Sequence, residues 1–362
     1  MKSNIKHLYI HIPFCSSICA YCAFTKFYYN EDLVIRYLSA LSKEINEKYK
    51  GDELDTIYIG GGTPSSLSIN TLFKLKEITD KLNKSKTCEF TFEVNPDVSF
   101  DKLDIIKSMG VNRLSIGIET INNKFYKSIE RFNDKRKIVK LISYCKKLFP
   151  NISVDLMYGF SSETVDDLDK DLDFVLSLGI NHISIYALQV EEHTKLYINK
   201  YNELDDERLN KMYYHIDDKL RSYGYNHYEI SNFAKEGFES RHNNSYWENK
   251  MYYGFGVGAS GYIGDVRYRN TNNLLNYENG KYITEYEKLE IYDKMVYEMI
   301  LGLRLKKGVS IKGFKKKYHK DIFDAFKIDD LIKEGCLEVK NDRIYIPVKY
   351  WFVENSILER FV

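Results

Sequence analysis

Six short β-rich runs, each followed by a segment with helical periodicity, constrain the fold more than any other feature of this chain. The runs are residues 7–12, 55–59, 88–94, 112–118, 152–157 and 182–187. Strict alternation of strands and helices is typical of a parallel sheet with right-handed crossovers. A closed barrel needs eight such units. Six units therefore predict an α/β fold in which residues 1–225 form an open, partial (β/α)6 barrel.

The pattern changes after residue 225. Residues 226–280 are rich in Tyr, Asn and Gly and lack long periodicity, so we expect a connecting region there. Helical patterns and a hairpin turn then follow at residues 284–303, 310–318, 328–334 and Asn341–Asp342. Helices followed by a small hairpin indicate a winged-helix-like α+β module over residues 281–362.

Charge and hydropathy exclude several classes of protein. Lys and Arg number 53 and Asp and Glu number 52, so no basic excess indicates a nucleic-acid partner. No apolar run approaches the roughly 18 residues that a membrane span needs. The N-terminal residues lack the apolar core of a secretion signal. We therefore expect a cytoplasmic protein without a transmembrane segment.

Three of the six cysteines lie together, directly after the first predicted strand. Cys15, Cys19 and Cys22 have the spacing C-x3-C-x2-C. Three thiolates can bind three irons of a [4Fe-4S] cubane and leave the fourth iron open to a small chelating molecule. The alternative is structural zinc with His11 as fourth ligand, although zinc ligands usually come as two separated pairs. The scattered cysteines are expected to be small buried side chains: Cys88, Cys145 and Cys336.

Glycines and carboxylates follow other predicted strands. The segment GGGTP, residues 60–64, follows the second run, where glycine lets backbone amides approach a ligand closely. Glu93, Glu119 and Asp155 also lie at or just after the ends of strands. Because barrel sites form at that end, these side chains could hold the hydroxyl and amino groups of one ligand. Each carboxylate could instead cap the helix that follows it.

These motifs, in this order, resemble the radical S-adenosylmethionine (SAM) superfamily. The segments YIHIPFC, GGGTPSSL, GVNRLSIGIET, DLMYGF and LGLRLKKG resemble, more narrowly, the oxygen-independent coproporphyrinogen oxidase group and its heme-chaperone branch. The resemblance spans residues 5–362. It implies SAM contacts at Tyr9, Tyr21, Gly61, Gly62, Thr63, Glu93, Glu119, Arg131, Asp155 and Ala187. The family usually has Gln where this chain has Glu119, and a carboxylate cannot donate the hydrogen bond that an amide can.

The segment HNNSYW matches the H-N-x-x-Y-W pattern of the chaperone branch. The resemblance implies heme binding by a loop that holds His242, Tyr246 and Trp247. A neutral imidazole is a good iron ligand, and aromatic rings pack well on a porphyrin. Nearby arginines could contact its carboxylates: Arg241, Arg267 and Arg269. Without the resemblance, a lone histidine in a Tyr-rich chain is more often structural.

Two features separate the chaperones from the oxidases of this group. The oxidases have a fourth cysteine two residues after the third, where this chain has Phe24. Only eight residues precede Tyr9, which leaves no room for the oxidases' N-terminal extension. We therefore predict a heme chaperone that binds a [4Fe-4S] cluster, SAM and heme. It would pass heme, as a monomer or dimer, to an acceptor hemoprotein that can be membrane-associated. The alternatives are an oxygen-independent coproporphyrinogen III oxidase and a zinc-stabilised binding module.

Overall fold

The six predicted strands are all present in the computed structural model, which describes residues 4–131 and 134–362. They are β1 (His7–Ile12), β4 (Leu54–Gly61), β5 (Lys84–Val94), β6 (Arg113–Glu119), β7 (Asn151–Tyr158) and β8 (His182–Ala187). Each pairs in parallel with the next. This confirms the predicted α/β fold built on an open parallel sheet.

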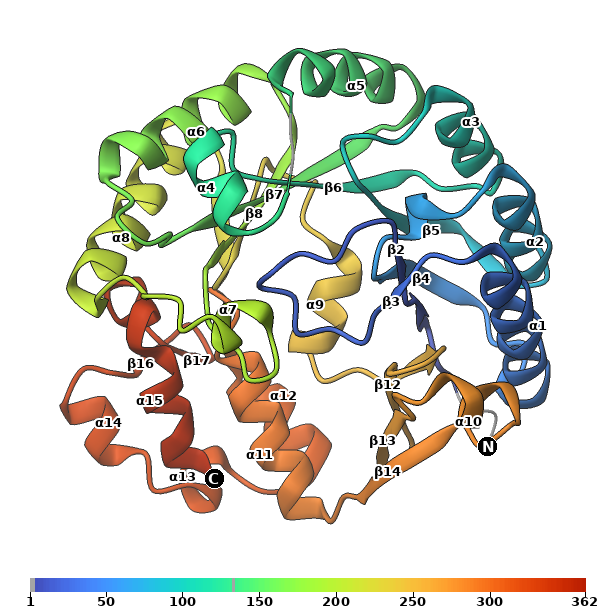
Figure 1. The fold of residues 1–362 in the computed structure, drawn as a ribbon. Coiled ribbons are helices and arrows are strands. Elements are labelled where there is room, and N and C mark those ends of the chain that lie inside the picture. Colours follow the sequence, from blue (N-terminus) through green and yellow to red (C-terminus); the bar gives the residue numbers. More distant parts are fainter. Residues whose placement is uncertain (1–3, 132–133) are drawn as a thin grey trace.

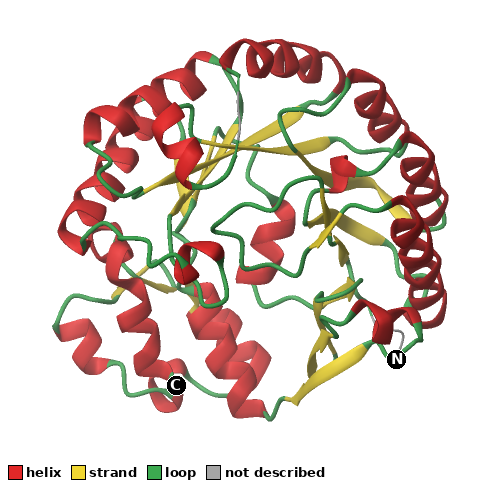
Figure 2. Ribbon diagram, viewed as in Figure 1, coloured by secondary structure: helices red, strands yellow, loops and turns green. Residues whose placement is uncertain are grey.

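Helices cover the outer face of this curved sheet, and Figures 1 and 2 show them as an outer layer around the strands. They are α1 (Glu31–Lys48), α2 (Ile69–Thr79), α3 (Phe100–Ser108), α5 (Lys135–Leu148), α6 (Val165–Ser177) and α8 (Asp206–Ser222). Helix α6 shows why they form. Leu168, Leu172 and Val175 recur at helical spacing and are fully buried against the sheet. Thr164 begins the helix with a capping box.

Short strands extend the sheet beyond both ends of this parallel core; all but β14 (Ile283–Lys288) come from the predicted connecting region, residues 226–280, and β14 comes from the start of the predicted C-terminal module. Strands β11 (Tyr252–Phe255), β12 (Ser260–Ile263), β13 (Val266–Asn270) and β14 (Ile283–Lys288) follow one another outward from β1. Strands β10 (Asn232–Ala234) and β9 (Asn226–Glu229) extend the β8 edge. Strand β11 is parallel to β1, whereas the other added strands pair antiparallel. One order therefore describes all twelve: β14-β13-β12-β11-β1-β4-β5-β6-β7-β8-β10-β9.

The predicted helix at 284–303 is wrong over its first part. Residues 283–288 form the edge strand β14, and helix α11 begins only at Ile291 and ends at Gly302. Every residue of β14 is exposed, so the strand has no apolar face that could have marked it in the sequence.

The C-terminal part contains the predicted helices and hairpin. After α11 come β15 (Val309–Ser310), α12 (Ile311–Tyr318), α13 (Ile322–Ala325), α14 (Asp329–Lys333), β16 (Glu338–Lys340), β17 (Arg343–Tyr345) and α15 (Glu354–Leu358). The predicted turn joins β16 to β17, with φ values of 50° at Asn341 and 63° at Asp342. Two positive φ values in succession are typical of a tight hairpin turn, and Asn and Asp tolerate them.

Helix α9 (Arg241–Trp247) corrects the expected loop around His242. It lies inside the curve of the sheet, at the centre of the view in Figure 1. Ser240 caps it by accepting a hydrogen bond from the Asn243 amide. The remaining short elements are β2 (Phe14–Cys15), β3 (Phe27–Tyr28), α4 (Asn123–Ser128), α7 (Lys195–Ile198) and α10 (Leu274–Glu278). Among the described residues, no helix combines the length and the apolar character that crossing a membrane requires.

Candidate functional site

A cavity of about 500 Å³ opens at the carboxyl ends of the parallel strands. All three clustered cysteines line it. So do nine of the ten residues expected to contact SAM: Tyr21, Gly61, Gly62, Thr63, Glu93, Glu119, Arg131, Asp155 and Ala187. Tyr9 is the exception, because its side chain borders a neighbouring cavity. The topology brings these residues together from the ends of β4 to β8 and from the loop after β2.

The cysteine loop places three thiols at the rim of this cavity. Cys15 ends β2, and its Sγ accepts a hydrogen bond from Thr63 Oγ1 at 3.6 Å. Cys19 Sγ accepts one from Arg131 Nη1 at 3.7 Å. Burial raises the pKa of Cys15 to about 11, so a metal must displace the proton as it binds. Within the described ranges, no three His, Cys, Asp or Glu side chains lie close enough together to bind one metal ion. In a cubane each thiolate binds a different iron.

The glycine segment lets the backbone pack directly against this loop. A Cβ on Gly62 would lie 2.8 Å from the Pro13 carbonyl carbon and 3.0 Å from Cys15 Sγ. Gly61 has a φ of 118°, which only glycine adopts easily, and its amide donates to Glu93 Oε2 at 3.0 Å. This segment therefore holds the cysteine loop and presents backbone, with no side chain, to the cavity.

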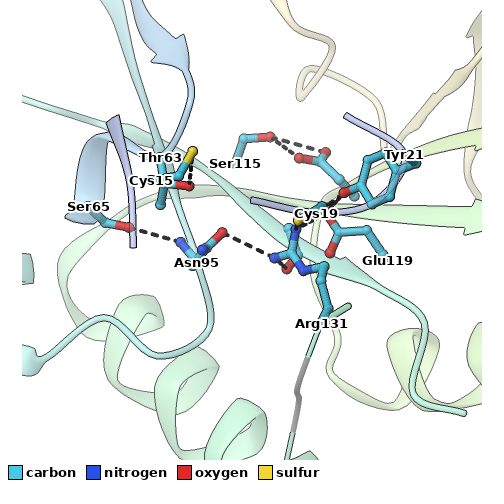
Figure 3. A network of polar contacts seen from close by, with 11 residues as sticks. Cys15, Cys19, Tyr21, Thr63, Ser65, Asn95, Ser115, Glu119 and Arg131 are labelled. Atoms are coloured by element: carbon cyan, nitrogen blue, oxygen red, sulfur yellow. Dashed lines mark hydrogen bonds and ion pairs between the residues drawn. The ribbon is translucent and has the colours of Figure 1, made fainter. Parts of the chain in front are cut away.

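Arg131 and Glu119 also line the cavity and form an ion pair with each other, and Figure 3 shows their polar contacts. Arg131 Nη1 donates to Glu119 Oε1 at 2.7 Å, and the Tyr21 hydroxyl donates to the same oxygen at 3.2 Å. Arg131 Nη2 donates to Asn95 Oδ1 and to the Gly117 carbonyl. Burial raises the pKa of Glu119 to about 7, although Arg131 opposes the shift. Glu119 Oε2 is buried and has no hydrogen-bond partner, so it fits a ligand that brings a donor group.

Two further carboxylates face the same space. Glu93 accepts from the Tyr58 hydroxyl at 2.8 Å, and burial raises its pKa to about 7. Asp155 accepts from Ser115 Oγ at 3.0 and 3.1 Å, and burial raises its pKa also. With Glu119 and Glu191, four carboxyl groups line a cavity that also holds three basic side chains, Lys26, Arg113 and Arg131. The cavity therefore offers hydrogen-bonding groups of both kinds to a polar ligand. The second arginine, Arg113, is 2% exposed and was not anticipated from the sequence.

The three residues of the H-N-x-x-Y-W motif, His242, Tyr246 and Trp247, do not line a common cavity. His242 is 1% exposed and lines neither of the two cavities described here. Its Nδ1 lies 2.8 Å from Thr56 Oγ1 and its Nε2 lies 2.7 Å from the Tyr246 hydroxyl. Burial lowers the pKa of His242 well below its usual range, so the ring is neutral. Trp247 turns toward the C-terminal part, where the Arg304 guanidinium lies 4.9 Å from its ring centroid.

A second cavity of about 300 Å³ lies beside the cysteine loop. Its lining holds four tyrosine or phenylalanine rings, one histidine and one arginine: Tyr9, His11, Ala23, Phe24, Thr25, Tyr246, Tyr252, Gly258, Ser260 and Arg269. Of the three arginines expected near heme, only Arg269 borders it. Arg241 donates to the Thr87 carbonyl, and Arg267 lies over the rings of Tyr262 and Tyr297. Tyr252 was missed in the sequence because one more tyrosine among 31 carries no signal.

Comparisons with known proteins agree with this arrangement. Residues 9–175 match the model of the radical SAM superfamily, and residues 292–349 match that of the HemN C-terminal domain. The heme chaperone HemW of Bacillus subtilis (strain 168) is 37% identical, over 99% of each chain. HemW of Lactococcus lactis is also 37% identical, over 98% of this chain and 96% of that protein.

Two further proteins match at lower sequence identity. A mitochondrial radical SAM domain-containing protein 1 of Danio rerio is 29% identical over 84% of this chain and 73% of its own. The structure of Escherichia coli coproporphyrinogen III oxidase (HemN), a radical SAM enzyme, superposes with a TM-score of 0.88. It covers 99% of this chain and 90% of that one at 21% identity, which establishes the shared fold alone. On the full-length identity to its bacterial relatives, this chain belongs to the HemW family of the radical SAM superfamily.

Proposed function

We propose that this protein is a heme chaperone, which binds heme and passes it to an acceptor hemoprotein in the cytoplasm or at a membrane. The observation that carries the proposal is the 37% identity to HemW heme chaperones over essentially the whole chain. A match confined to the radical SAM part would have left the function open. Here the similarity includes the added strands, helix α9 and the C-terminal part.

We further propose that Cys15, Cys19 and Cys22 hold a [4Fe-4S] cluster and that SAM occupies the larger cavity. The three thiols at the rim, the side-chain-free wall at Gly61 and Gly62 and the carboxyl groups of the lining support this assignment. The cluster, when bound, supplies an open iron for the amino acid part of SAM. This chain's own groups would position the rest: Glu93 and Asp155 accept hydrogen bonds from amino and hydroxyl groups, and Glu119 Oε2 accepts one more.

The test uses one anaerobic preparation of the full-length protein. We expect four irons and four sulfides per chain, a ratio that follows from the proposed cubane. We also expect stoichiometric heme uptake, and loss of the heme to an apo-hemoprotein when the two are mixed. Transfer is read from the acceptor's own Soret band after separation. A protein that takes up heme and never releases it would contradict the chaperone role, and one that takes up none would contradict heme binding.

A further inference from the structure

The first cavity extends inward from the cysteine loop along the parallel strands. Strand β6 marks both of its ends, because Glu119 is the last residue of that strand, Arg113 is the first, and both line the cavity. The rise of a strand separates the two positions by roughly 20 Å. Helix α9, inside the curve of the sheet (Figure 1), adds Asn243 to the lining. The neighbouring His242 packs against Tyr58, with ring centroids 5.2 Å apart.

Arg113 is a buried cation without a counter-ion in contact. It is 2% exposed, and its Nε is buried without a hydrogen-bond partner. Arg131 is paired with Glu119 at 2.7 Å, whereas the guanidinium of Arg113 forms no ion pair and no hydrogen bond with any residue that the structure describes. A buried charge is strongly destabilising unless an opposite charge or hydrogen bonds compensate it. An anion bound in the cavity would supply that compensation.

The groups nearest in charge to Arg113 do not replace such an anion. Glu93 and Asp155 each accept hydrogen bonds from other side chains, and burial raises the pKa of both. His182 and His242 are neutral, since burial lowers the pKa of each well below its usual range. The two carboxyl groups repel a dianion such as phosphate more strongly than a monoanion. The surroundings of Arg113 therefore favour a singly charged anion.

Asn243 supplies a second uncommitted polar group. Its backbone amide donates to Ser240 Oγ in the cap of α9. Its side-chain amide lines the cavity and makes no hydrogen bond to another described residue. An anion beside this amide selects its N–H2 side, which offers two donors, and a guanidinium offers five in a planar fork. Such a fork matches the two oxygens of a carboxylate.

We propose that Arg113 and Asn243 form a subsite at the inner end of the first cavity, which binds a small monocarboxylate beside SAM. This ligand is distinct from SAM, whose own carboxylate belongs to the amino acid part that we place at the cluster. The inference goes beyond heme binding and rests on the proposed function only for the placement of SAM. Asn243 of the HNNSYW segment thus serves the first cavity, whereas Tyr246 borders the second.

The experiment titrates propionate into the full-length protein with its cluster oxidised, and follows binding by saturation-transfer NMR with and without SAM. We expect saturable binding that SAM does not displace. Propionamide, a neutral molecule of the same shape, is expected to give no saturable signal, and inorganic phosphate to bind more weakly than propionate. Arg113→Gln is expected to raise the Kd for propionate by about tenfold or more, and Asn243→Ala by a smaller factor.

The matched control is Asn244→Ala, on the next residue of α9, which lines neither cavity. We expect it to bind propionate as the wild type does. The iron and sulfide content verifies that each variant is folded. If Arg113→Gln fails this check, Asn243→Ala decides, because its half-buried side chain has no partner to lose.

Four results would overturn the proposal. They are an unchanged propionate Kd in the folded variants, stoichiometric displacement of propionate by SAM, binding of phosphate as tight as that of propionate, and absence of saturable binding to the wild type. In the last case the charge of Arg113 is balanced at a distance by Glu93 and Asp155. Heme uptake and the effect of SAM on the reduced cluster's EPR spectrum are measured on the same preparation. Failure of this subsite is therefore distinguishable from failure of the proposed function.

Discussion

Glu354, buried between the barrel and the C-terminal helices, gives a quantitative test of the structure. Its Oε1 accepts from Arg304 Nη1 at 2.7 Å, while Oε2 is buried without a partner. The residue is 3% exposed, and a second buried carboxylate, Glu229, lies close enough to repel it. Burial, partly offset by Arg304, raises the pKa of Glu354 to about 7. We therefore expect Glu354→Gln to stabilise the protein at alkaline pH.

The magnitude follows from the pKa. The difference between about 7 and the ordinary 4.5 corresponds to about 3 kcal/mol, at about 1.4 kcal/mol per pKa unit. Because the folded state binds this proton more tightly than the unfolded state, stability falls as pH rises from 4.5 through 7. Glutamine carries no charge at any pH and keeps an oxygen for Arg304. The variant is thus expected to gain about 1–3 kcal/mol at pH 8 and close to nothing well below the ordinary pKa of 4.5, where Glu354 is protonated in both the folded and the unfolded state.

The assay is urea unfolding between pH 5 and 8, followed by tryptophan fluorescence. The chain has two tryptophans. Trp247 contacts Arg304, and Trp351 is buried three residues before Glu354. The control is Glu334→Gln, whose exposed ion pair with Arg360 contributes at most about 1 kcal/mol. Our reasoning is refuted if the gain of Glu354→Gln is equal at pH 5 and pH 8, or if the variant is less stable at pH 8.

Three further predictions concern the cavity. We expect Cys19→Ala or Cys22→Ala to abolish the cluster's absorbance, and variants of the three distant thiols to keep it: Cys88→Ala, Cys145→Ala and Cys336→Ala. Loss of the cluster in any of those three would contradict the ligand assignment. Gly62→Val is expected to remove the change that SAM causes in the EPR spectrum of the reduced cluster. The added side chain would stand at the cavity wall, where its Cβ would lie 2.8 Å from the Pro13 carbonyl carbon. The control is Gly313→Ala, on helix α12. Incubation of the reduced protein with SAM and coproporphyrinogen is expected to yield no protoporphyrinogen by chromatography, because Phe24 replaces the oxidases' fourth cysteine; stoichiometric product would favour an oxidase.

The parallel core could be predicted because its information is local. Each parallel strand of this core contains a run of buried apolar residues, and helices with an apolar stripe follow. The strands added at the edges carry no such pattern. Strand β14 is exposed along its whole length, and its position depends on pairing with β13. Long-range pairing of short polar strands leaves little trace in the sequence.

The candidate site likewise has one part that the sequence predicts and one part that it does not. Residues at the ends of parallel strands, such as Glu93 and Asp155, fall at one edge whenever the sheet forms, so their meeting could be expected. The surroundings of His242 could not. Its Nδ1 contacts Thr56 of β4, 186 residues away in the chain, and such a long-range contact leaves no local pattern. The contact of Nε2 with Tyr246 is local, one turn along α9. A motif read as letters does not tell which of its members faces a cavity.

Helix α9 has two contact surfaces, and this has a thermodynamic consequence. Tyr246 borders the second cavity, whereas the next residue, Trp247, packs beneath Arg304 of the C-terminal part. We expect a ligand that moves Tyr246 to shift Trp247 as well, which would couple occupancy of the cavity to the placement of the C-terminal part. Such coupling is reciprocal: the factor by which one event alters the other is the same in both directions. On the proposed function, an acceptor protein that contacts only the C-terminal part is therefore expected to change the affinity of this cavity for its ligand without touching that ligand.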